Sequence, residues 1–104
     1  MQVTYLKLFV PEALRHGDTL LYEWILRQAS SVGIHGGTAS RAIASFGRHG
    51  KLHEQHFFEL AGDVPIILDF FASEEEINRL LALLKTEKES LVYMKMPAEA
   101  GQTN

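Results

Sequence analysis

The chain has 104 residues, of which 46% are hydrophobic and 22% are charged, and its formal net charge is -3. This length fits one compact domain, and this composition excludes a disordered or fibrous protein. The chain contains no cysteine, which excludes disulfide bonds and thiolate metal sites and favours a cytoplasmic protein. The negative charge argues against a nucleic-acid-binding surface, and no apolar run approaches the roughly 18 residues of a membrane span.

The N-terminal part of the chain predicts a strand followed by a helix. Apolar residues alternate over residues 1–10, which is typical of a strand, and Lys7 interrupts any export signal there. Asp18 is a suitable N-cap for a helix that runs to about Val32, and Gly33 is a suitable C-cap. The apolar stripe of this helix consists of Leu21, Ile25 and Ala29.

The middle of the chain predicts two strands separated by a long loop. Small and β-branched residues without helical spacing predict a strand within residues 35–46, with 39–46 as its clearest part. Residues 47–63 have no clear period and contain several glycines, which predicts a loop excursion. A continuous apolar run over residues 64–71 is typical of a buried strand.

The C-terminal part predicts a helix and a last strand. Ser73 followed by Glu76 is a capping box, and apolar residues recur at helical spacing until about residues 85–88. Residues 90–96 form the last predicted strand, and residues 97–104 form a polar tail.

The predicted order is strand, helix, strand, strand, helix, strand. This order is typical of an α+β ferredoxin-like βαββαβ sandwich, in which a four-stranded antiparallel sheet carries both helices on one face. The predicted domain spans residues 1–96 and includes the excursion over residues 47–63. The other face of the sheet stays uncovered although its strands are apolar, so we expect several copies of the chain to cover it in a closed cyclic oligomer.

The sequence around the predicted loop resembles a known family. The run Ser45-Phe46-Gly47-Arg48 resembles the signature at which PII signalling proteins leave their second strand and begin the long T-loop. The stretches GGTASRAIASFGRHGKLH, DVPIILDF and RHG…LYEWIL resemble the PII-like family known as domain of unknown function 190, over most of residues 3–96. The resemblance implies a PII-like fold and a homotrimer that binds an adenine nucleotide between subunits. It also implies a loop that signals to a partner protein such as a membrane transporter.

The glycine-flanked basic run at the start of the excursion is the candidate ligand site. Glycine makes main-chain amides approachable, Arg48 offers a planar fork for phosphate, and Lys51 offers a point charge. Arg41 is either a supporting cation in a subunit cleft or one half of a salt bridge, and Gly37 either admits a ligand to the main chain or forms a bulge. The alternative for the whole run is a solvated turn. The candidate ligand is AMP, ADP or ATP, and the candidate residues are Gly37, Arg41, Gly47, Arg48, His49, Gly50 and Lys51.

The histidines of the same excursion indicate a metal site as the alternative to nucleotide binding. Imidazole is a common metal ligand, and a CutA-like metal-binding or metal-responsive trimer would pool these side chains from several subunits. The three candidates are His49, His53 and His56. The sequence contains no nucleophile elbow, zinc motif or Walker loop, so we expect a protein that is not an enzyme.

Overall fold

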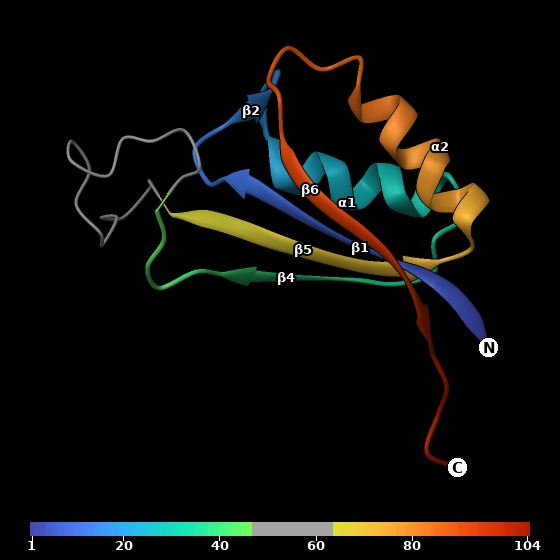
Figure 1. Ribbon diagram of the computed structural model, residues 1–104. Coiled ribbons are helices and arrows are strands. Elements are labelled where there is room, and N and C mark those ends of the chain that lie inside the picture. The colour runs from blue at the N-terminus through green and yellow to red at the C-terminus, as the bar shows by residue number, and fades with distance from the viewer. Residues whose placement is uncertain (47–63) are drawn as a thin grey trace.

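The computed structural model describes residues 1–46 and 64–104 and shows an α+β sandwich (Figure 1). Its main elements are β1 Gln2–Pro11, α1 Leu21–Ser31, β4 Gly37–Arg41, β5 Pro65–Ala72, α2 Glu74–Leu84 and β6 Val92–Glu99. The four strands form one antiparallel sheet in the order β4-β5-β1-β6. The predicted ferredoxin-like architecture is therefore confirmed. No helix among the described residues is long and apolar enough to cross a membrane.

One face of the sheet, which we call the helix face, is covered by both helices. Side chains alternate along a strand, so Leu6, Leu8 and Val10 of β1 point to the same side, where all three are buried. Leu68 and Phe70 of β5 join them in the hydrophobic core. The helices contribute Leu21, Ile25, Ala29, Ile77, Leu80 and Leu84 to this core.

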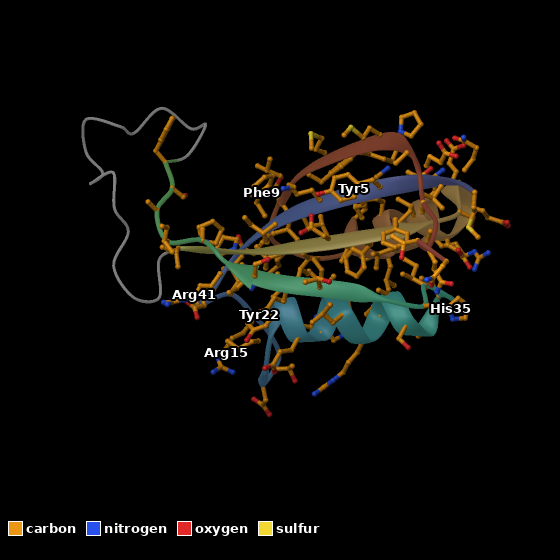
Figure 2. All side chains as sticks on the ribbon, turned by 90° about the horizontal axis from the view of Figure 1, so that it is seen from below. Tyr5, Phe9, Arg15, Tyr22, His35 and Arg41 are labelled. Carbon is orange, nitrogen blue, oxygen red and sulfur yellow. The ribbon has the colours of Figure 1, made fainter. Side chains whose placement is uncertain are left out.

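The opposite face, which we call the open face, carries no helix in the described part of the chain. Tyr5 and Phe9 of β1 point away from α1 (Figure 2). The register of β1 with β6 places Met96 opposite Tyr5 and Met94 opposite Lys7, so these methionines lie on the open face too. Its apolar side chains are Phe9, Ile67, Phe71, Val92, Met94 and Met96. The apolar face that the sequence predicts is thus present, and no helix of the described residues covers it.

The prediction for the start of α1 is wrong. A small hairpin of β2 Arg15–His16 and β3 Thr19–Leu20 precedes the helix, and Asp18 lies in the turn of that hairpin instead of capping α1. Gly17 takes the left-handed φ of 61° that the turn needs, which glycine adopts without steric cost. The N-cap of α1 is Leu20, whose side chain makes no capping hydrogen bond.

The hairpin contacts the rest of the molecule through His16. The imidazole of His16 stacks on the ring of Trp24 in α1, with ring centroids 4.0 Å apart. Its Nδ1 also lies 2.8 Å from Oε1 of Glu87, in the segment that follows α2. His16 therefore connects the hairpin to α1 and to the segment that follows α2.

The end of α1 agrees with the sequence. Gly33 has a φ of 101°, and its N–H donates to the carbonyl of Ser30 at 3.2 Å. The N–H of Ile34 donates to the carbonyl of Ala29 at 3.0 Å, which completes a Schellman motif. The predicted C-cap is confirmed.

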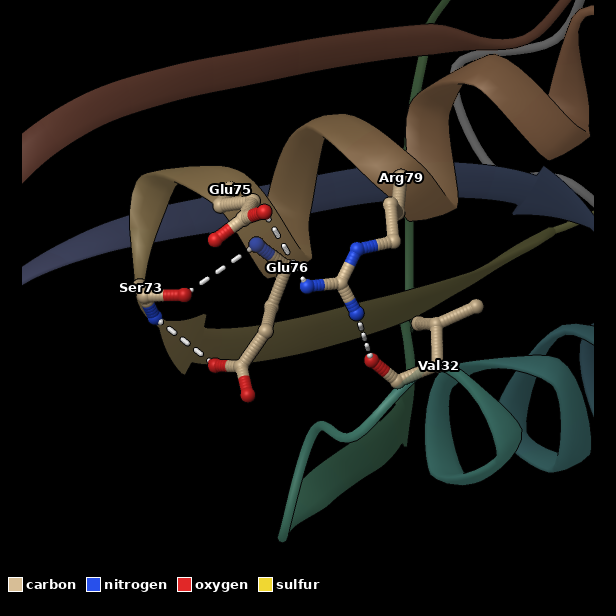
Figure 3. A network of polar contacts seen from close by, with 5 residues as sticks. All are labelled: Val32, Ser73, Glu75, Glu76 and Arg79. Carbon is tan, nitrogen blue, oxygen red and sulfur yellow. Dashed lines mark hydrogen bonds and ion pairs between the residues drawn. The ribbon is translucent and has the colours of Figure 1, made fainter.

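The capping box at the start of α2 is also confirmed (Figure 3). The N–H of Glu76 donates to Oγ of Ser73 at 3.1 Å, and the N–H of Ser73 donates to Oε1 of Glu76 at 3.0 Å. The hydrogen bond from the Ser73 N–H, and after it the interaction with the Ser73 hydroxyl, lowers the pKa of the Glu76 carboxyl. Arg79 donates to the carbonyl of Val32 at 2.9 Å and lies 3.5 Å from Glu75, which ties the end of α1 to α2.

Two strand boundaries differ from the prediction. β4 ends at Arg41, close to where its partner β5 begins at Pro65, and beyond Ala42 no strand among the described residues continues the pairing. β6 continues through Pro97 to Glu99, three residues beyond the predicted end. Met1 and Ala100 exchange hydrogen bonds, so even-numbered residues of β6 direct their main-chain groups toward β1. Pro97 therefore directs its nitrogen to the free edge, where the missing donor costs no hydrogen bond of the sheet.

Candidate functional site

The sheet anchors the chain on both sides of residues 47–63. The N–H of Ala42, just after β4, donates to the carbonyl of Pro65 at 3.1 Å. The N–H of Glu12, just after β1, donates to the carbonyl of Val64 at 3.3 Å. Val64 is buried, and β5 lies between β1 and β4. Three strands therefore converge on the two residues that follow this segment.

Arg41 lies at this end of the sheet, and one nitrogen of its guanidinium is bound by a carboxylate. Its Nε donates to Oε1 of Glu12 at 3.0 Å. Half of the Arg41 side chain is exposed (50%), while Glu12 is less exposed (27%). The two terminal nitrogens of the guanidinium, Nη1 and Nη2, have no partner among the described residues. A salt bridge is thus present within the chain, and the fork that remains is suited to a phosphate or carboxylate.

Gly37, the other candidate in β4, has a packing contact on the helix face. A Cβ at Gly37 would meet Cε1 of Phe70 at 2.5 Å and Cδ2 of Leu26 at 3.4 Å. A contact below 3.0 Å to a core ring is not tolerated without movement, so the glycine is required for Phe70 to lie against β4. The packing explains Gly37 without a ligand, and its role in binding stays a prediction.

An apolar hollow of about 490 Å³ lies beside the same end of the sheet. Its floor comes from Phe9, Pro65 and Ile67 on the open face, and its wall from the chain that leaves β4. The wall residues are Ala42, Ala44, Ser45 and Phe46. A hollow of this size and lining fits a planar apolar group. Arg41, which directly precedes the wall residues, points to the helix face and therefore does not line this hollow.

A polar cluster interrupts the open face at its centre. The hydroxyl of Tyr5 donates to Oδ1 of Asp69, and Nζ of Lys7 lies 4.0 Å from the same oxygen. The hydrogen bond to Asp69, with smaller contributions from desolvation and from the charge of Asp69, raises the pKa of Tyr5 to about 12. These three residues satisfy one another within a single chain, so the open face can be covered without leaving an unpaired charge.

The remaining candidate residues lie outside the described residues. They are the ligand candidates Gly47, Arg48, His49, Gly50 and Lys51 and the metal candidates His53 and His56, with His49 in both sets. In the part of the chain that the structure describes, no group of three or more histidine, aspartate or glutamate side chains could hold a metal ion. Of the predicted site, the structure therefore describes only the β4 residues.

Comparison with known sequences identifies the family. Residues 3–97 match the family model of DUF190, described as "Uncharacterized ACR, COG1993". The chain belongs to the DUF190 family. It is 27% identical over 90 residues to a UPF0166 protein of Aquifex aeolicus, covering 86% of each chain. It is 32% identical over 79 residues to a UPF0166 protein of Methanocaldococcus jannaschii, covering 76% of this chain and 72% of the relative.

Solved structures similar to this chain include PII-like proteins. A structure of CPII from Thiomonas intermedia, described as bound to ADP and bicarbonate, aligns with a TM-score of 0.70 at 20% identity. The alignment covers 98% of this chain and 91% of CPII. A putative PII-like signaling protein from Thermus thermophilus aligns with a TM-score of 0.65 at 17% identity, covering 94% and 88% of the two chains. The PII-like fold of the DUF190 chain is thereby shown.

Glu12 is the residue near the candidate site that sequence reasoning missed. It lies 29 positions before Arg41, and neither periodicity nor a motif pairs the two. The available signal was indirect, since an arginine in a strand of small residues needs a carboxylate and Glu12 directly follows the first strand.

Proposed function

We propose that this protein is a non-enzymatic PII-like regulator. It binds an adenine nucleotide, AMP, ADP or ATP, in clefts between the subunits of a homotrimer, and it signals to a partner protein through residues 47–63. The observation that carries the proposal is the fork of Arg41, which has two nitrogens without a partner among the described residues and lies where a PII-like sheet leads into this segment. Support comes from CPII, a protein of the same fold that is described as bound to ADP.

The site would combine Arg41 with the basic run that follows it. Arg48 and Lys51 would contact phosphate, together with the main-chain amides of Gly47 and Gly50. Ligand binding would change the order of residues 47–63, which the partner reads. The resemblance to PII proteins favours a membrane transporter as the class of partner.

The open face is the surface that we propose to join the subunits. Its apolar side chains include Phe71, which is 61% exposed, and Met94 and Met96, which are 43% and 46% exposed in the single chain. A closed ring buries the same surface in every copy, and the polar cluster of Tyr5, Lys7 and Asp69 needs no partner from another subunit.

Isothermal titration calorimetry with AMP, ADP and ATP, with and without magnesium, tests the nucleotide. We expect heat with at least one nucleotide and a loss of roughly tenfold or more in affinity for Arg41→Ala, because a charge-assisted contact to phosphate is removed. Arg27→Ala is the matched control, since Arg27 is an exposed arginine on α1. The absence of heat with all three nucleotides would contradict the proposal.

Native mass spectrometry tests the assembly and reports any bound small molecule at the same time. We expect a trimer for the natural protein and dissociation for Met94→Lys, which would bury an unpaired charge. Tyr93→Lys is the control, because Tyr93 is half exposed but lies on the helix face of the same strand. A monomer at micromolar concentration would contradict a trimer.

A further inference from the structure

The Glu12–Arg41 pair connects the ends of β1 and β4, the two strands on either side of β5. Its carboxylate follows β1 and its guanidinium ends β4, and the two strands lie on opposite sides of β5. Arg41 is paired with Ile66, a helix-face residue, and the ion pair spans the start of β5. The contact at 3.0 Å therefore joins the two neighbours of β5 through side chains, in addition to their main-chain bonds.

The geometry of the contact orients the guanidinium. A guanidinium is planar and rigid, so an acceptor at Nε fixes the direction of the whole fork. Because Glu12 takes Nε, the edge formed by Nη1 and Nη2 is directed away from this carboxylate and stays available. Glu12 is the more buried partner, and its own N–H is bound to the carbonyl of Val64, so the carboxylate is attached to a fixed point of the sheet.

We propose that Glu12 is a positioning residue for anion binding by Arg41. This inference rests on the proposed nucleotide site and adds to it a residue that touches no ligand. A negative charge beside a phosphate site repels the ligand, so a carboxylate there is a disadvantage unless it holds the arginine in its binding orientation. The same contact couples ligand binding at Arg41 to the anchor of Glu12 at Val64, the first described residue after 47–63.

Two substitutions of Glu12 separate positioning from charge. Glu12→Gln keeps an oxygen acceptor for Nε and removes the negative charge, whereas Glu12→Ala removes both. If Glu12 positions Arg41, ADP affinity falls roughly tenfold in Glu12→Ala and is retained or increased in Glu12→Gln. Glu23→Ala is the control, because Glu23 is an exposed carboxylate in the first turn of α1. Tighter binding by both variants, or no change in either, would overturn the proposal.

A double-mutant cycle with Arg41→Lys gives a second measurement. Lysine is a point charge without a planar fork, so Glu12→Ala should cause no further loss of ADP affinity in the Arg41→Lys background. Additive losses would show that Glu12 acts independently of the fork and would overturn its positioning role.

The Nε–H resonance of Arg41 tests positioning in the ligand-free protein. We expect it to be observed and protected in the natural chain and in Glu12→Gln, and to broaden or shift in Glu12→Ala. An Nε–H signal that is the same in Glu12→Ala would overturn the inference. If no nucleotide binds the natural protein, the proposed function fails, while this resonance still decides whether Glu12 orients Arg41.

Discussion

The two faces of one sheet differ most clearly at two adjacent residues of β5. Phe70 is 1% exposed and contacts the helical layer, whereas Phe71, its neighbour in the sequence, is 61% exposed on the open face. Both lie in a continuous apolar run, so hydrophobicity does not separate them. What separates them is that α1 and α2, the helices of the described residues, both cover the side of Phe70. The helix face is thus explained by folding, and the open face needs an explanation in assembly or binding.

The largest expected effect is the loss of the Phe70 ring. Phe70→Ala removes a fully buried side chain and should lower the free energy of unfolding by about 3–5 kcal/mol. Phe71→Ala on the other face should cost less than about 1 kcal/mol within a single chain, and any larger cost should depend on protein concentration because it comes from the proposed contact between subunits. Urea unfolding at several protein concentrations measures both. An equally large and concentration-dependent cost for Phe71→Ala would show that the open face is covered too.

A methyl group at Gly37 should have the next largest effect. Gly37→Ala places a Cβ 2.5 Å from the Phe70 ring, so either the ring or β4 must move, at about 1–3 kcal/mol. Gly36→Ala is the matched control, because a Cβ there meets nothing within 4 Å. Thermal unfolding of the two variants gives the difference directly. If they are equally stable, the contact between β4 and Phe70 does not hold β4 in place.

The loss of the capping box of α2, which lies on the helix face, should have an intermediate effect on the free energy of unfolding. Ser73→Ala removes the acceptor for the N–H of Glu76 and should destabilise the protein by about 1 kcal/mol. The pKa of Glu76 is lowered in the folded protein, so its contribution is present above its ordinary pKa and is lost as pH falls through the folded value. The main cause of this shift, the N–H of residue 73, is kept in Ser73→Ala, so the fall in urea stability toward acid pH should persist in Ser73→Ala and shrink in Glu76→Gln. An acid dependence that is the same in Glu76→Gln as in the natural protein would contradict this role of the Glu76 carboxylate.

The smallest expected effect concerns the open face at alkaline pH. Tyr5 has a raised pKa of about 12, so its hydrogen bond to Asp69 contributes fully below the ordinary tyrosine value of 10.0 and is lost as pH rises toward 12. Phenolate absorbance should show a component near 12 that disappears in Tyr5→Phe. Asp69→Asn should move that component toward the ordinary value. A titration curve of Tyr5→Phe that matches that of the natural protein would contradict the assignment.

The sequence predicted the fold well where a single local interaction decides an element. The capping box at Ser73 and the C-cap at Gly33 were both recognisable because their partners lie within a few positions. The start of α1 was missed because Asp18 is equally suited to a hairpin turn after Gly17, and the contact of His16 with Glu87 comes from a residue 71 positions away. The length of β4 depends on where β5 begins, which strand propensity does not reveal.

The candidate site was less accessible to prediction. The sequence indicated Arg41 either as a supporting cation in a subunit cleft or as one half of a salt bridge. The structure shows a salt bridge with Glu12 that leaves Nη1 and Nη2 without a partner among the described residues. Glu12 was not predicted because its role depends on the strand order, which places β1 and β4 on either side of β5. Local pattern indicates the residue types of a site, whereas the distances between them come from topology.

Pro97 has a consequence for what can attach to the sheet. An added strand on the β6 side would require a main-chain donor at this position, and proline has none. Lys95 and Glu99 flank it on the same edge, and their charges oppose the approach of another apolar strand. The edge of β4 has no proline and no charge before Arg41. Among the described residues, the sheet therefore opposes an added strand at the β6 edge and carries no such feature at the β4 edge before Arg41, so any strand-exchanged assembly is expected to extend from the β4 side.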